Sequence, residues 1–203
     1  MRAKDMFLRN ENYLVSFFII VFLLFPHNVF SDEKDKDKVF DYLNSLKNFS
    51  ASFLQTDGAS LSEGKVYIGE KRVRAEYISP TNILIILDKN KAMYYNYELE
   101  EDEFFDPKNT NAWFFYDIFM SPLFFEDGLI KIKNNELTIV KRGIYNEEQS
   151  YVIKLYFEND PLVLRNIEVV VNDDKLKLSI FNHSYNEVYD KDFFKLINPK
   201  LLN

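Results

Sequence analysis

Apolar and polar side chains alternate between residues 49 and 80, and this pattern constrains the fold more than any other feature of the chain. Three short runs show it, at residues 49–55, 64–68 and 72–80. Successive side chains of a β-strand point to opposite faces of a sheet, so these runs predict an antiparallel meander. Within the third run, Val73, Ala75 and Tyr77 share the face that would point to an apolar interior. That interior is either a packed core or a cavity.

The rest of the chain extends this sheet. Residues 35–47 carry apolar side chains at helical spacing and predict one amphipathic helix ahead of the first strand. Residues 83–87 are continuously apolar, so that strand must be covered on both faces, and residues 92–97 form its hairpin partner. Acidic residues 98–106 then interrupt the pattern. Further strands are predicted at residues 129–133, 136–142, 151–157, 164–171, 175–184 and 193–196, roughly ten or eleven in all.

Residues 112–125 form the most hydrophobic segment after the N-terminal region and contain Trp113, the only tryptophan. They predict a helix, or two short helices interrupted at Ser121-Pro122, because proline disfavours a helical conformation in the residue before it. A segment with almost no polar face is either buried in a core or covers something apolar. The pattern leaves both possibilities open.

The N-terminus has the features of a secretory signal. Basic side chains precede an apolar run at residues 13–25, which Pro26 ends and which is short for a membrane span. We therefore predict a cleaved signal peptide at residues 1–31, followed by a single exported domain at residues 32–203. An uncleaved membrane anchor is the alternative.

Composition excludes several function classes. The net charge of -7 disfavours nucleic acid as a partner, because phosphate binding needs a basic surface. The chain has no cysteine, and beyond the predicted signal it has one histidine, His183, which we expect at the surface or edge of the sheet. Transition-metal sites and nucleophilic catalysis therefore lack their usual residues. We expect no enzyme, no metal and no cofactor, but an aromatic-rich binding domain.

Several motifs, in their order, resemble the LolA family of periplasmic carriers of outer-membrane lipoproteins. After the first helix come Phe-x-Gln at Phe53 and Gln55, Gly-x-hydrophobic-x-hydrophobic at residues 64–68, and Arg-x-x-Tyr-x-x-Pro at Arg74, Tyr77 and Pro80. Later matches are Asp88 with Tyr94-Tyr95, Ser121-Pro122-Leu123, and Asp160-Pro161-Leu162-x-Leu164-Arg165. The chain departs from the family at Lys89, where glycine is usual, and at Lys71-Arg72, where Arg-Pro is common.

The resemblance implies an unclosed antiparallel β-barrel, a half-barrel whose concave apolar face is capped by helices. It also implies a periplasmic chaperone that takes the acyl chains of lipoproteins released from the inner membrane and shuttles the lipoproteins to the outer membrane. Its partners would be acylated lipoproteins as cargo and an inner-membrane ABC-type release complex. Whether an outer-membrane lipoprotein receptor accepts the cargo is left open, and we expect a monomer.

The resemblance also assigns residues to the acyl-chain site. The sheet side of the site would be lined by Val66, Ile68, Val73, Ala75, Tyr77, Ile83 and Ile85. The lid, which we define as residues 112–125, would contribute Trp113, Phe114, Ile118, Phe119, Leu123 and Phe124. Arg72, or failing it Arg74, would donate hydrogen bonds to lid carbonyls and hold the empty form shut. Ordinary core packing for the apolar residues, and a solvated strand face for the arginines, are the alternatives.

A different function fits the same fold. A periplasmic binding or sensor protein for other lipids would use the same half-barrel. The outer-membrane lipoprotein receptor of this fold would need a lipid-modified cysteine, which the chain lacks.

Overall fold

The structure is a computed structural model that describes residues 33–145 and 149–202. The predicted signal peptide lies outside the described residues. In chain order the elements are α2 (Glu33–Ser45), η1 (Leu46–Asn48), β1 (Phe49–Thr56), β2 (Leu61–Gly69), β3 (Arg72–Ser79), β4 (Ile83–Leu87), β5 (Ala92–Asn96), β6 (Glu101–Phe105), η2 (Pro107–Asn109), α3 (Ala112–Met120), η3 (Pro122–Phe125), β7 (Leu129–Lys133), β8 (Glu136–Tyr145), β9 (Gln149–Asn159), β10 (Leu162–Val171), β11 (Asp174–Tyr185) and η4 (Pro199–Leu201).

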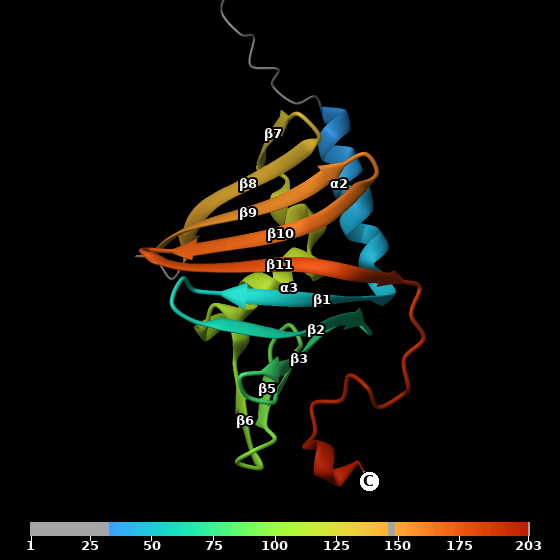
Figure 1. Ribbon diagram of the computed structural model, residues 1–203, viewed down its shortest axis with the longest axis vertical. Helices are drawn as coiled ribbons and strands as arrows, with labels where there is room; N and C mark the ends of the chain where they lie inside the picture. Colours follow the sequence, from blue (N-terminus) through green and yellow to red (C-terminus); the bar gives the residue numbers. More distant parts are fainter. Residues whose placement is uncertain (1–32, 146–148, 203) are drawn as a thin grey trace, which may run out of the picture. The chain divides into compact units, whose positions relative to one another are not determined.

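The eleven strands of the described residues form one antiparallel sheet, in the order β6-β5-β4-β3-β2-β1-β11-β10-β9-β8-β7. Neighbours in the chain are neighbours in the sheet except at its centre, where β1 pairs with β11 and joins the two halves (Figure 1). Strands β6 and β7 are the two edges and do not pair with each other, so the barrel is open. The predicted mainly-β half-barrel is confirmed.

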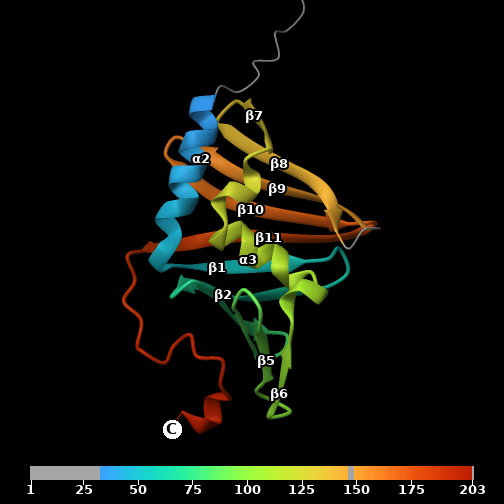
Figure 2. The same cartoon turned by 180° about the vertical axis from the view of Figure 1, so that it is seen from behind.

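Helices α2 and α3 cover one face of this sheet, which we call the inner face (Figure 2). Val39 and Leu43 of α2, and Phe114 and Ile118 of α3, are buried in one cluster with inward side chains of the strands. The lid has the predicted interruption, because α3 ends at Met120 and η3 starts at Pro122. Within the described residues, no helix combines the length and apolar character that crossing a membrane requires.

The chain ends in a strap, residues 186–202, that lies on the opposite, outer face of β2–β5. The Tyr189 hydroxyl donates to the Phe49 carbonyl at 2.7 Å, and Phe194 is fully buried against Gly69. Leu196 packs on a small outer cluster made by Leu84, Ile86, Met93 and Tyr95. The strand predicted at residues 193–196 is wrong. Phe193 contacts Tyr67 while its neighbour Phe194 packs over Gly69, so both rings turn towards the sheet, which the alternation of a strand does not permit.

Two other expectations need correction. The acidic run at residues 98–106 contains β6, whose carboxylates are exposed because β6 is an edge strand. His183 lies on interior strand β11, not at an edge, and is half-buried, with Nε2 at 2.8 Å from the Leu164 carbonyl. Burial lowers the pKa of His183, so the ring is neutral at pH 7.

Candidate functional site

An apolar cavity of about 210 Å³ lies between the inner face of the sheet and α3. Strands β1–β4 and β11 form its floor, and one side of α3 forms its roof. We call it the inner cavity. Its lining residues are Phe53, Gln55, Val66, Val73, Ala75, Tyr77, Ile85, Leu87, Asn111, Ala112, Phe115, Phe119, Leu176, Leu178 and Ile180. None of them carries a charge.

Strand register explains how the floor is built. Ala75 of β3 lies directly opposite Val66 on β2 and Ile85 on β4, so the three side chains share the inner face. The small alanine between two larger residues leaves space beneath α3. Beside it, Gly64 allows the Phe53 ring to lie close to β2, because a Cβ at Gly64 would lie 2.7 Å from that ring.

Two polar side chains that line the inner cavity bond to each other. Tyr77 donates from its hydroxyl to Oε1 of Gln55 at 2.8 Å, and the Tyr77 ring meets Phe53 edge-on with centroids 5.1 Å apart. Burial raises the pKa of Tyr77 to about 12, so the phenol stays neutral at physiological pH. The cavity therefore offers apolar contact area without charge, which suits a hydrocarbon chain.

A second space of about 480 Å³ lies at the C-terminal half of α3, on the same inner face of the sheet. We call it the outer cavity. It is lined by Leu43, Asn44, Lys47, Asn48, Ile68, Glu70, Lys71, Tyr116, Phe119, Met120 and Pro122. Phe119 lines both cavities. Val66 and Ile68 are alternate residues of β2 on the same face, one in each cavity, so the two spaces follow each other along the strand and the helix.

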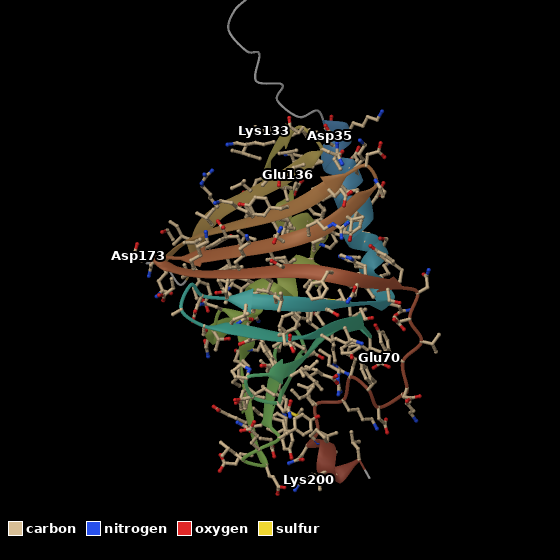
Figure 3. All side chains as sticks on the ribbon, in the orientation of Figure 1. Asp35, Glu70, Lys133, Glu136, Asp173 and Lys200 are labelled. Atoms are coloured by element: carbon tan, nitrogen blue, oxygen red, sulfur yellow. The ribbon has the colours of Figure 1, made fainter. Side chains whose placement is uncertain are left out.

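The rim of the outer cavity includes a strained turn. Glu70 and Lys71 form the two-residue hairpin between β2 and β3, and their φ angles are 48° and 59°. Such hairpins favour asparagine and glycine, because other side chains tolerate positive φ poorly, at about 1–3 kcal/mol each. Figure 3 labels Glu70 at this turn. Glu70 lies 3.8 Å from Arg72, whereas no ion pair within the described ranges involves Lys47 or Lys71.

The structure places the sheet-side residues of the predicted site together on the inner face. Five of them line the inner cavity: Val66, Val73, Ala75, Tyr77 and Ile85. Ile68 lines the outer cavity instead. Ile83 lies opposite Tyr77 on the same face but outside both sets of lining residues.

On the lid side, Phe119 is the one residue of the six predicted that lines either of these two cavities. Phe114 and Ile118 have no exposed surface and belong to the packed core, so the alternative interpretation holds for both. Trp113 and Phe124 pack on Tyr151 of β9. Leu123 is 72% exposed and does not line either cavity. Helix α3 presents Ala112, Phe115 and Phe119 to the inner cavity, a spacing of three and four residues that follows the helical turn.

The predicted lid-holding arginines contact a different element. Arg72 donates to the Phe194 carbonyl at 3.3 Å and pairs with Asp88 at 2.8 Å. Arg74 donates to the Phe193 carbonyl at 2.5 Å, with its guanidinium 4.2 Å from the Phe193 ring. Both arginines therefore hold the strap. The prediction that they donate to the lid is wrong, because they alternate with Val73 and Ala75 and so project from the outer face.

A tyrosine, instead of an arginine, forms hydrogen bonds that hold the lid. The Tyr145 hydroxyl, at the end of β8, donates to the Lys108 carbonyl and lies 3.4 Å from the Thr110 carbonyl. These carbonyls immediately precede α3. At the other end of the lid, Lys36 Nζ of α2 donates to the Glu126 carbonyl at 3.0 Å. Few direct polar contacts therefore fasten the lid, and the sequence analysis identified none of them.

The sequence analysis also missed lining residues on β1 and β11. Phe53 and Gln55 alternate within a run that was predicted as a strand, and Leu176, Leu178 and Ile180 do the same near the C-terminus. The alternation was visible in both runs. Alternation alone does not predict that β1 pairs with β11, because this pairing joins segments more than 120 residues apart. Among the residues that the structure describes, no group of three histidine or carboxylate side chains is placed to hold a metal ion.

No protein-family model matches the chain, and no curated protein matches its sequence. Several solved structures resemble this one. An uncharacterized conserved protein from Thermus thermophilus has 10% identity and a TM-score of 0.49, with 78% of this chain and 94% of that chain covered. A MucA/MucB complex of Pseudomonas aeruginosa has 10% identity and a TM-score of 0.45, with 81% and 61% covered. A structure of MucB has 8% identity and a TM-score of 0.47, with 80% and 62% covered. The match spans about three fifths of those MucB chains.

Proposed function

We propose that this protein is a periplasmic carrier that binds the acyl chains of lipoproteins between its sheet and α3. The observation that carries the proposal is the inner cavity, which is apolar, uncharged and roofed by a helix with few polar fastenings. An acyl chain leaving a membrane gains about 0.8 kcal/mol for each methylene that such a surface keeps from water. Non-directional aromatic and aliphatic contacts accept chains of different length.

A carrier must also release its cargo, and the size of the cavity bears on this. Ligand pockets usually measure ~300–1,000 Å³, so the inner cavity of about 210 Å³ is too small for a whole lipid anchor. Binding therefore requires α3 to move outward, and closure of α3 then favours release. The arrangement described above corresponds to the closed form of the carrier.

The route follows from the resemblance to LolA described above. The carrier would receive lipoproteins from an inner-membrane ABC-type release complex and deliver them to the outer membrane, with or without a separate receptor there. It would act as a monomer, would need no cofactor, and would catalyse no reaction. The predicted signal peptide would direct it to the periplasm.

The proposal is tested by native mass spectrometry of the mature protein with a synthetic triacylated lipopeptide. The control is the same peptide without acyl chains. We expect a one-to-one complex with the acylated form only. Binding of both peptides, or of neither, contradicts an acyl-chain carrier.

The second candidate is a binding or sensor protein for other lipids, which the same cavity favours equally. The two candidate functions differ in which ligand competes best for the acyl-chain site. Free phospholipid that displaces the lipopeptide at equal concentration would favour this second function, whereas preference for the lipopeptide favours the carrier.

A further inference from the structure

The two cavities differ in chemistry, and Phe119 lines both of them. The inner cavity has no charged lining residue, whereas Lys47, Glu70 and Lys71 stand among the lining residues of the outer one. Lys47 follows α2 in η1, and Lys71 occupies the strained hairpin turn, so two separate elements each contribute a lysine to the lining of the same cavity. The rest of its lining is mixed: Leu43, Ile68 and Met120 supply apolar surface, beside the polar side chains of Asn44, Asn48 and Tyr116.

Charge at the rim of the outer cavity favours an anion. Arg72 lies 3.8 Å from the Glu70 carboxylate but pairs more closely with Asp88, at 2.8 Å, so Glu70 keeps a negative charge at the rim. The ammonium groups of Lys47 and Lys71 have no ion-pair partner within the described ranges, and both side chains are exposed. The two lysines outnumber Glu70, so the lining of the outer cavity carries a net positive charge in a protein whose net charge is -7. An anionic head group would meet both cations while its chain contacts the apolar walls.

We infer that the outer cavity is the entry subsite for an anionic, single-chain amphiphile such as a fatty acid. Its head group lies between Lys47 and Lys71, and its chain passes Phe119 into the inner cavity. Phe119 is the gate, because it is the residue that lines both spaces. The inference rests on the proposed acyl-chain site, and it adds a ligand class, an entry path and a gate to that site.

The gate is tested by a series of straight-chain carboxylates from hexanoate to tetradecanoate, measured by calorimetry below their micelle concentrations. Each methylene that enters an apolar site raises affinity about fourfold, the equivalent of ~0.8 kcal/mol. In the wild type we expect this increase to continue along the series. In Phe119→Trp the larger ring blocks the passage, so the increase stops once the outer cavity is filled. If affinity rises equally with each methylene in the two proteins, Phe119 is not a gate.

Phe119→Leu and Phe125→Leu control for folding and specificity. Phe125 is fully buried on the same segment and lines neither cavity. We expect faster association of dodecanoate with Phe119→Leu, because the gate is smaller, and an unchanged rate with Phe125→Leu. Equal rates in both variants contradict the gate even where Phe119→Trp fails to fold.

The head-group subsite is tested with dodecanoate and dodecanol, which share a chain and differ in charge. The double variant Lys47→Gln, Lys71→Gln should lose about tenfold in affinity for the carboxylate and nothing for the alcohol, whereas Lys177→Gln, an exposed lysine outside both cavities, should change neither. Equal loss for both ligands overturns the subsite. If the triacylated lipopeptide binds and the carboxylates do not, this inference fails while the proposed function stands. If neither binds, both fail.

Discussion

Tyr145 fastens the lid at the point where the chain enters α3, and its loss should free the lid without disturbing the sheet. Tyr145→Phe keeps the ring, which stacks on Trp113 with centroids 5.4 Å apart, and removes the hydroxyl that donates to the Lys108 carbonyl. A hydrogen bond of this kind contributes about 1 kcal/mol, so opening should increase about fivefold. Hydrogen exchange of the amides in α3 measures this opening.

Tyr189→Phe is the matched control. It also removes one hydroxyl that donates to a backbone carbonyl, but on the outer face, where it holds the strap to Phe49. We expect unchanged exchange in α3 for this variant. Faster exchange in both variants would mean that α3 responds to general destabilisation and that Tyr145 has no specific part in holding it.

Lys71 combines backbone strain with a position at a candidate head-group site, so replacing it should have two opposite effects. Lys71→Gly relieves the positive φ of 59° and should raise the free energy of unfolding by about 1 kcal/mol. The same change removes one ammonium and should weaken dodecanoate binding. Urea denaturation and calorimetry measure the two quantities. A variant that is more stable and binds equally well would show that the turn has only a structural role.

Arg72 and Arg74 show what alternation could and could not predict at this scale. Their alternation with Val73 and Ala75 already placed them on the outer face, away from any lid over the inner face. The resemblance assigned an arginine to the lid, whereas alternation assigns both arginines to the outer face. The residue that holds the lid, Tyr145, has no signal of its own in the sequence, since its partners are backbone carbonyls 35 and 37 residues away.

The strap is the element that the arginines support, and Arg74 is the residue on which to test it. Arg74→Met removes the hydrogen bond to the Phe193 carbonyl, the contact with the Phe193 ring and the pair with Glu76. These contacts together are worth about 1–2 kcal/mol. Trypsin should then cleave the strap at Lys191 or Lys195 about tenfold faster, as read by mass spectrometry of the fragments.

Hydrogen exchange of the amides in α3 distinguishes a strap-holding role of Arg74 from a lid-holding role. We expect it to stay at the wild-type level in Arg74→Met, because the arginine lies on the other face of the sheet. If α3 exchanges faster while cleavage of the strap is unchanged, Arg74 stabilises the lid and does not hold the strap.

The accuracy of the element predictions followed the environment of each strand. Strands with one face in the core, such as β2 and β3, were visible because burial enforces alternation. Edge strand β6 was missed, because Glu101, Asp102 and Glu103 in succession erase alternation where little is buried. The strap was mistaken for a strand, since two adjacent phenylalanines resemble a buried run. Its docking depends on Gly69, which leaves the space that the Phe194 ring fills.

The stability of the whole domain should fall at alkaline pH. Burial raises the pKa values of Tyr67 and Tyr77 to about 12, whereas an unfolded tyrosine titrates near pH 10. The neutral phenols favour the folded state, so their contribution is complete below about pH 10 and is lost as the pH rises towards 12. The loss is up to ~1.4 kcal/mol per pH unit for Tyr77 and smaller for Tyr67, which is more exposed to solvent screening. Urea denaturation at pH 8, 10 and 11 measures this, and Tyr77→Phe should show a shallower decline. If the free energy of unfolding declines identically in the wild type and in Tyr77→Phe, Tyr77 is not a source of the pH dependence.

The inner cavity is also a packing defect, and its cost to stability is a reason to ask what it is for. Unfilled space beneath α3 deprives Ala75 and its neighbours of contacts that a packed core would supply. Proteins commonly retain such defects where function needs them, so filling the cavity should stabilise the fold and abolish binding.

Ala75→Leu makes this test at a single position. The larger side chain enters the inner cavity from β3 and should raise the free energy of unfolding by about 1 kcal/mol, part of the gain expected for three buried carbons. Ala51→Leu is the control, because Ala51 is buried opposite Val66 in packed surroundings, and the same change there should destabilise by about 1–3 kcal/mol. Acyl-chain binding should disappear in the stabilised Ala75→Leu variant alone. Destabilisation by Ala75→Leu would show that the space is already filled, and undiminished binding would move the acyl chain to another part of the molecule.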